Sequence, residues 1–182
     1  MIIGVPIPHN FFPAWEFAWC LIKISSKYSV YYAEGPYIYE NRNRMIRYAK
    51  QMNDDLLMVD SDIIFTAEYA EKMAEHLQTL PAVTGVYHIA EGIPALFRRT
   101  ENDYEYTSIP ESLSVIGACG GGFLGMSREL IQKLPPQPCD NVFESSMHGE
   151  DISLCHRINE IAQLWCDPSI RLGHIRMKIL QA

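Results

Sequence analysis

Apolar positions in the first half of the chain alternate between continuous blocks and stripes with helical spacing. The blocks lie at residues 2–7, 28–33 and 56–59, and the stripes lie at residues 13–24, 41–52 and 67–80. Leu56-Leu57-Met58-Val59 is apolar at every position, as expected for a strand that is covered on both faces of a parallel sheet. The pattern therefore predicts three strands alternating with three helices, joined by right-handed crossovers.

The first two predicted helices each have a stripe that we expect to face the core. The stripe of the first consists of Trp15, Ala18, Trp19 and Ile22. The stripe of the second consists of Met45, Ile46, Ala49 and Met52. Thr66 can cap the third helix, which ends before Pro81.

The second half of the chain changes character. Strands are expected at residues 83–90, 95–98, 104–107 and 115–119, and helices at residues 127–134 and 151–163. A last strand is expected between the final helix and Arg171. No repeat or linker divides the chain, so we expect one domain over residues 1–182. The predicted fold class is α/β, with a mixed, mostly parallel central sheet flanked by helices.

Composition narrows the class of protein. Of the 182 residues 48% are hydrophobic and 20% are charged, which is typical of a globular domain. The formal net charge of −7 gives no support for a large nucleic-acid footprint. Five cysteines without a CxxC pair indicate reduced thiols and a cytoplasmic location. No apolar run is long enough to span a membrane, and residues 1–6 lack the features of a signal peptide.

Two carboxylates, Asp60 and Asp62, directly follow the strand at residues 56–59. Ligands of open α/β sheets bind outside the carboxyl ends of such strands. Paired carboxylates suit Mn²⁺ or Mg²⁺, which bind few protein carboxylates together with substrate phosphates. The sequence thus predicts a metal–diphosphate site here, with an ordinary acidic turn as the alternative.

A second acidic pair, Glu150 and Asp151, opens the last predicted helix. Acids at a helix N-terminus can cap free N–H groups, and one of them could instead act as a general base. The helix N-terminus favours the ionised carboxylate that a base requires. Residue type and position leave both roles open.

Three further features could belong to a site. Gly120-Gly121-Gly122 lies between a strand and a helix, which favours close approach of the backbone to a ligand, and it matches neither a Walker A loop nor a GxGxxG fingerprint. His174 could complete a carboxylate–imidazole metal site, or it could be structural. Arg44 could reach a phosphate or face solvent.

The order of these motifs resembles that of the GT-A class of nucleotide-sugar glycosyltransferases, and within it the large inverting family that includes cellulose- and chitin-synthase-like domains. The similarity extends from residue 41 to residue 174. The strings that carry it are Asn43-Arg44, DDLLMVDSDIIF at 54–65, GACGGGFLGMSRELIQKL at 117–134, HGEDISLCHRINE at 148–160 and DPSIRLGH at 167–174.

The resemblance implies a hexosyltransferase-like enzyme that uses Mn²⁺ or Mg²⁺. Its donor would be a nucleotide-diphosphate sugar, and its acceptor a hydroxyl of a glycan, lipid or protein, with inversion at the sugar. Asp60 would face the ribose or the metal, while Asp62 and His174 would be metal ligands. Asp151, or else Glu150, would deprotonate the acceptor.

The same resemblance assigns further residues to the donor. Gly121 and Gly122 would lie where donor sugar and acceptor meet. The other donor-binding residues would be Pro6, Pro8, His9 and Arg44. The family's acidic stretch after the second strand is replaced here by Tyr32-Ala33-Glu34-Gly35, so no residue is assigned to the nucleobase.

Three alternatives remain open at this point. A haloacid-dehalogenase-like phosphatase also has DxD after a buried strand, but on its first strand. A GT-A-like nucleotidyltransferase would normally have a basic glycine-rich loop near the N-terminus. A non-catalytic nucleotide-sugar-binding or scaffold protein could retain the same fold without turnover.

Overall fold

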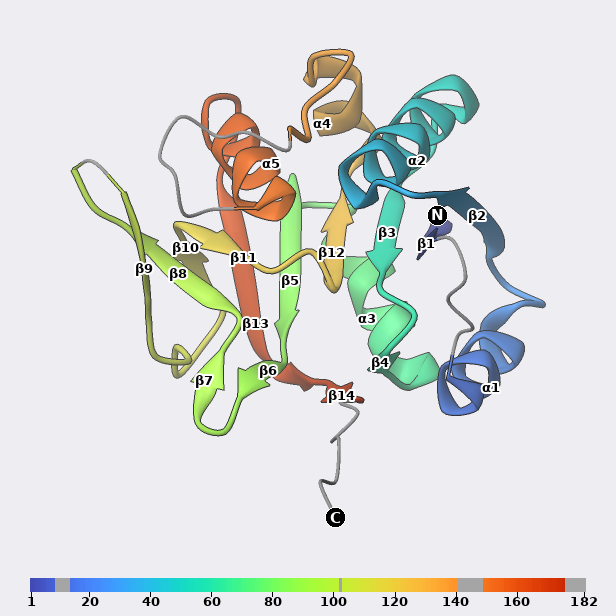
Figure 1. Ribbon diagram of the computed structural model, residues 1–182, viewed down its shortest axis with the longest axis horizontal. Helices are drawn as coiled ribbons and strands as arrows, with labels where there is room; N and C mark the ends of the chain where they lie inside the picture. Colours follow the sequence, from blue (N-terminus) through green and yellow to red (C-terminus); the bar gives the residue numbers. More distant parts are fainter. Residues whose placement is uncertain (9–13, 102, 141–148, 176–182) are drawn as a thin grey trace.

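The structure is a computed structural model that describes residues 1–8, 14–101, 103–140 and 149–175. Among these residues a central sheet is built from β1 (Ile2–Pro8), β2 (Ser29–Gly35), β3 (Leu56–Val59), β5 (Ala82–Val86), β10 (Ser114–Ile116), β12 (Phe123–Met126) and β13 (Leu164–Arg171). Their order across the sheet is β10-β13-β5-β12-β3-β1-β2 (Figure 1). β1 is parallel to β2 and β3, and β5 is parallel to β13, whereas β12 is antiparallel to β3 and β5. The predicted α/β class with a mixed sheet is confirmed.

Helices cover both faces of this sheet (Figure 1). The helices are α1 (Trp15–Ile24), α2 (Ile38–Met52), α3 (Ala67–His76), α4 (Arg128–Lys133) and α5 (Glu150–Asn159). Apolar side chains of α2, α4 and α5 share one core, and those of α1 and α3 share the other. None of the helices in the described part of the chain is long and apolar enough to cross a membrane.

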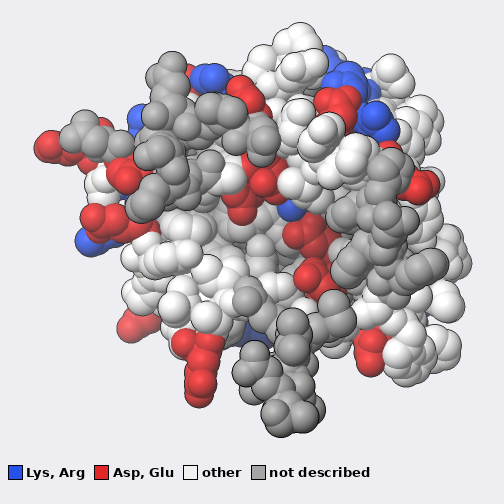
Figure 2. Space-filling view, in the orientation of Figure 1, with Lys and Arg blue, Asp and Glu red and all other residues white. Residues whose placement is uncertain are grey.

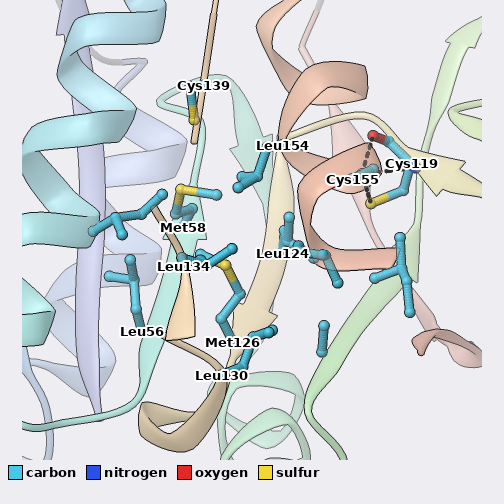
Figure 3. Packing of buried hydrophobic residues seen from close by; sticks show 14 of the residues in the cluster. Leu56, Met58, Cys119, Leu124, Met126, Leu130, Leu134, Cys139, Leu154 and Cys155 are labelled. Carbon is cyan, nitrogen blue, oxygen red and sulfur yellow. Dashed lines mark hydrogen bonds between the residues drawn. The ribbon is translucent and has the colours of Figure 1, made fainter. Parts of the chain in front are cut away.

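The uniformly apolar composition of β3 follows from its position in the sheet, because its side chains alternate between these two cores. Leu56 and Met58 belong to the core under α2, α4 and α5, whereas Leu57 and Val59 belong to the core under α1 and α3. A strand covered on both faces needs apolar residues at every position. Figure 3 shows Leu56 and Met58 in the first of these cores, together with the buried cysteine pair Cys119 and Cys155.

Smaller sheets flank the carboxyl edge of the central one. β8 (Leu96–Arg99) pairs with β9 (Tyr104–Tyr106) and β11 (Ala118–Cys119). β6 (His88–Ala90) pairs with β7 (Ile93–Pro94), and β4 (Ile63–Ile64) pairs with β14 (Gly173–His174). The last pairing places His174 opposite Ile63, next to the DxD motif. Two segments that are far apart in the sequence thus meet beside β3.

Several predicted boundaries differ from the structure. The expected strand at 83–90 is divided between β5 and β6, and the one at 115–119 is divided between β10 and β11, each pair lying in different sheets. α2 begins at Ile38, earlier than expected, while α3 and α5 end earlier than expected. The amides that follow α3 and α5 close turns onto the last carbonyls of each helix, for example Leu80 onto His76 and Ala162 onto Ile158.

The predicted core stripe of α1 is wrong. Trp15, Trp19 and Ile22 are 68%, 49% and 61% exposed, and the buried side chains are instead Phe17, Cys20, Leu21 and Ile24. Both faces of this helix are apolar, so periodicity alone cannot decide which one packs on the sheet. In α2, Met45, Ile46 and Ala49 are buried as expected, but Met52 is 57% exposed.

A polar cluster around Asp167 joins α3 to β13. The carboxylate lies 2.7 Å from His76 Nε2 and 3.0 Å from Lys72 Nζ, and it accepts hydrogen bonds from Ser169 N at 2.9 Å and Ser169 Oγ at 2.6 Å. Burial raises the pKa of Asp167, but these hydrogen bonds outweigh burial and hold it well below its ordinary value. The charged form therefore stabilises the folded state.

We expect Asp167→Asn to lower the free energy of unfolding by about 2–3 kcal/mol at pH 7, because it removes the charge of a buried carboxylate that accepts several hydrogen bonds. A depressed folded-state pKa gives stability that is fully present above the unfolded pKa of about 4 and is lost as the pH falls toward the folded value. Urea unfolding should therefore give a difference about 1 kcal/mol smaller at pH 3. Glu75→Gln, an exposed acid of α3, is the control. An equal difference at both pH values would contradict this role.

Candidate functional site

The carboxyl end of β3 and the glycine-rich turn before β12 lie side by side. β12 is antiparallel to β3, and Phe123 is opposite Val59. The amide of Asp60 donates to the carbonyl of Gly122 at 3.0 Å, which places the turn directly against the DxD motif. Two motifs about sixty residues apart in the sequence therefore form one edge of the sheet.

A buried arginine from α2, Arg42, holds this edge together. Its guanidinium is 3% exposed and donates from Nε to Glu150 Oε1 at 3.1 Å, from Nη1 to the Gly121 carbonyl at 3.0 Å, and from Nη2 to Asp60 Oδ2 at 3.2 Å. Burial lowers the pKa of Arg42, but the carboxylates of Asp60 and Glu150 outweigh it and raise the pKa above its ordinary value. Arg42 therefore remains charged.

Asp60 is only partly satisfied by this arginine. Burial raises the pKa of Asp60, as do the charges of Asp62 and Glu150, while Arg42 opposes them. Its Oδ1 lies 3.0 Å from Arg42 Nη2 but out of line for a hydrogen bond, and the atom is buried without a hydrogen-bond partner among the described residues. Such an oxygen is suited to accept from a ligand hydroxyl or to approach a cation.

Asp62 and His174 form a close pair, with His174 Nε2 lying 3.3 Å from Asp62 Oδ2. The other ring nitrogen, Nδ1, is 2.8 Å from the His88 carbonyl. A carbonyl can only accept, so Nδ1 carries a proton, and in neutral His174 the lone pair of Nε2 faces the carboxylate. Two acceptors face each other unless a proton or a metal ion lies between them. A carbonyl that orients the imidazole in this way is typical of histidine metal ligands.

These donors fit a divalent cation only as part of a larger coordination shell. No group of three or more His, Cys, Asp or Glu side chains in the described ranges lies close enough together to hold a metal ion. Asp62 and His174 supply two donors, and Mn²⁺ or Mg²⁺ commonly completes its shell with phosphate oxygens and water. Figure 2 shows acidic side chains gathered around a hollow at the centre of this face. The geometry fits a metal that binds together with a diphosphate.

The acidic pair of α5 has two different roles. Gly149 occupies the N-cap position, and no side chain caps the helix. Glu150 pairs with Arg42, whereas Asp151 Oδ1 accepts from the Ile152 amide at 2.8 Å. Burial raises the pKa of Asp151, and so does the Glu150 charge, while Arg42 opposes them. The pKa of Asp151 is therefore raised above its ordinary value, although this residue lies in the first turn of α5.

Tyr87 was not predicted from the sequence, and its hydroxyl accepts from the Gly122 amide at 3.1 Å. Burial raises the pKa of Tyr87 well above its ordinary value, and the charge of Asp60 adds to this. The glycines are required by these neighbours. A Cβ at Gly121 would lie 2.6 Å from Arg42 Cζ, and one at Gly122 would lie 2.9 Å from Tyr87 Cζ. The local sequence around Tyr87 and Arg42 gave no signal that these two residues contact the glycine-rich turn.

Three of the remaining predicted donor residues, Pro6, Pro8 and Arg44, lie near the ends of β1 and β2. Pro6 and Pro8 are opposite Ala33 and Gly35 of β2. Arg44 is partly exposed, and its Nη1 donates to the Glu34 carbonyl at 2.9 Å. His9 lies outside the described residues.

The comparisons with known proteins found similar solved structures but no similar sequence. No family model matches the chain, and no curated protein sequence matches it. Among solved structures, A197 from STIV has a TM-score of 0.65 at 14% identity, covering 100% of this chain and 96% of A197. A crystal structure of GalNAc-T7 with UDP, GalNAc and Mn²⁺ has a TM-score of 0.60 at 15% identity over 96% of this chain. This chain spans 37% of that GalNAc-T7 chain.

At these identities the likeness concerns the fold alone. The structure of this chain shows directly the order of the central strands, the antiparallel pairing of β12 with β3 and the helices on both faces of the sheet. The chain has an α/β fold that resembles a glycosyltransferase GT-A domain, with its DxD motif, glycine-rich turn and late histidine at one edge of the sheet.

Proposed function

We propose that residues 1–182 form a single metal-dependent glycosyltransferase domain. It transfers a sugar from a nucleotide-diphosphate donor to an acceptor hydroxyl, with inversion at the sugar. The observation that carries the proposal is the contact of Asp62 with His174 at the carboxyl end of β3, with the partly satisfied Asp60 beside it. The GT-A-like fold supports it, since GalNAc-T7 of the same fold was solved with UDP, GalNAc and Mn²⁺.

Asp62 and His174 would hold the metal ion, and Asp60 would lie against either the metal or the ribose. The metal, when bound, offsets the negative charge that grows on the departing nucleoside diphosphate. His174 is already oriented for this role by the His88 carbonyl. We assign Pro6, Pro8, His9 and Arg44 to the nucleotide side of the donor site.

Asp151 would act as the general base. Its carboxylate accepts the acceptor's hydroxyl proton, the hydroxyl oxygen bonds to C1 of the donor sugar, and the C1–O bond breaks with its electron pair on the diphosphate. Attack in line with the departing group inverts C1. Glu150 is less suited, because its carboxylate is bound by the buried Arg42. Gly121 and Gly122 would lie where donor sugar and acceptor meet.

The phosphatase alternative is disfavoured by the surroundings of Asp60. A nucleophilic carboxylate must approach phosphorus freely, but Asp60 is paired with Arg42, which is also bonded to Glu150 and Gly121. The non-catalytic alternative shares the donor site and differs only in turnover. Separate measurements of donor binding and of sugar transfer therefore distinguish an enzyme from a non-catalytic protein.

We predict that Mn²⁺ and a nucleoside diphosphate stabilise the protein only together. A ligand at 100 times its Kd raises the free energy of unfolding by about 2.7 kcal/mol, or the melting temperature by roughly 5–10 °C for a chain of this size. Asp62→Asn and His174→Ala should each abolish most of this shift. Thermal melts with Mn²⁺ and a panel of nucleoside diphosphates measure it.

The matched control for these variants is His88→Ala. Its side chain is exposed, and only its backbone carbonyl contacts His174, so the shift should be retained. If no nucleoside diphosphate shifts the melt in the presence of Mn²⁺, or if Asp62→Asn retains the full shift, the proposed donor site is wrong.

We predict that Asp151→Asn lowers the transfer rate by about 10²–10⁴-fold, as is usual for removal of a general base, while the metal–nucleotide shift is unchanged. Because burial raises the pKa of Asp151, the wild-type rate should fall on the acid side at a pH above the ordinary Asp value. Glu150→Gln removes a charge that raises this pKa, so its acid limb should move to lower pH.

The pH profile of kcat/KM for transfer distinguishes the two acids. If Glu150→Gln retains substantial transfer activity and its pH profile is shifted, the general base is Asp151. Loss of transfer in Glu150→Gln with full activity in Asp151→Asn would reverse the assignment.

A further inference from the structure

A cavity of about 660 Å³ opens beside Asp151. Its walls come from β8, β9, the segment around Tyr87 and the start of α5. The lining residues that matter here are Phe97, Asp103, Glu105, Tyr106, Gly120 and Asp151. Its volume is within the range of small-molecule sites. The proposed base and the first glycine of the glycine-rich turn thus both line the cavity.

Aromatic rings from the β8–β9 hairpin also line the cavity. Phe97 and Tyr106 are register partners on neighbouring strands, with ring centroids 4.8 Å apart and planes inclined by 30°. Tyr106 is 56% exposed, although its ring rests on Phe97. Tyr104 is buried, and its hydroxyl is 3.3 Å from His156 Nδ1. The hairpin therefore presents a supported aromatic surface that a ligand can cover.

Among the described residues, the charged groups that line the cavity are carboxylates. Asp103, Glu105 and Asp151 line it, and no Lys, Arg or His is among the described lining residues. Arg98 binds Glu105 at 2.7 Å and offsets one of these charges. A phosphate in the cavity would face carboxylates without a lining cation, which is unfavourable at short range. Sugar hydroxyls, in contrast, can donate to carboxylates while the C–H face of the ring covers an aromatic side chain.

We propose that this cavity binds the acceptor and that the acceptor is a neutral glycan. The inference rests on the proposed transferase function and adds the class of its acceptor. The reacting hydroxyl lies at the Asp151 end, and a second part of the glycan covers Tyr106 and Phe97. Acceptors that carry a phosphate next to the reacting group are excluded by the carboxylates.

Ligand-observed saturation-transfer NMR tests the binding directly on the full chain. The probes are cellotriose and chitotriose, with farnesyl phosphate and a Ser/Thr-rich peptide as competing classes. The wild-type protein should bind at least one trisaccharide, and Tyr106→Ala should weaken that binding by about tenfold. Tyr32→Ala is the matched control, since Tyr32 is 55% exposed on β2, at the far edge of the sheet, and binding should be unchanged.

The outcomes separate this inference from the proposed function. Trisaccharide binding that depends on Tyr106 supports the glycan site, even if Mn²⁺ and nucleoside diphosphates fail to stabilise the protein and the transferase proposal falls. A metal–nucleotide shift without trisaccharide binding overturns the glycan inference and leaves the donor site intact. Binding of farnesyl phosphate or of the peptide in place of the trisaccharides, or trisaccharide binding equal in Tyr106→Ala and Tyr32→Ala, also overturns it.

Discussion

The buried guanidinium of Arg42 is the interaction on which the rest of the site depends. It joins Asp60 after β3, the Gly121 carbonyl before β12 and Glu150 at the start of α5. Each of these groups would be costly to bury alone, and removing the shared cation would leave two carboxylates uncompensated, at about 3–5 kcal/mol. One planar side chain with donors in a fixed geometry can satisfy three acceptors at once, which an ammonium on a flexible stem does less well. Arg42 therefore joins three segments at this edge of the sheet through its own side chain.

This arrangement divides the acids of the site between different tasks. Asp60 and Glu150 are held by Arg42. Asp62 faces His174, whose tautomer is set by the His88 carbonyl, and in the proposed function this pair would hold the metal ion. Asp151 is half-buried and lines a cavity, where its raised pKa favours accepting a proton. Environment thus distinguishes carboxylates that the sequence presents only as two acidic pairs.

Much of the fold could be predicted, because its signals are local. The uniformly apolar β3 indicated a strand covered on both faces, and Thr66 caps α3 by accepting from Tyr69 N, as its position suggested. The buried face of α1 was mispredicted because apolar residues occupy both sides of that helix. Local periodicity cannot rank two apolar faces.

Within the site, the sequence indicated which residue types could act but not which of them meet. The order of motifs placed His174 with the DxD motif, and the β4–β14 pairing brings it there. Arg42 was one of three nearby arginines without a distinguishing mark, because its partners Gly121 and Glu150 are 79 and 108 residues away. Tyr87 was missed for the same reason, since its role depends on the Gly122 amide.

The central claim is that Asp62 and His174 bind a metal ion together with a nucleoside diphosphate. Pulsed electron paramagnetic resonance of Mn²⁺ bound to the ¹⁵N-histidine-labelled protein tests it most directly, with and without the nucleoside diphosphate that stabilises the protein. The account predicts coupling to one histidine nitrogen and to ³¹P in the same complex, with the nitrogen coupling absent in His174→Ala. A spectrum with ³¹P coupling but no histidine nitrogen, or with a nitrogen coupling that persists in His174→Ala, would contradict it.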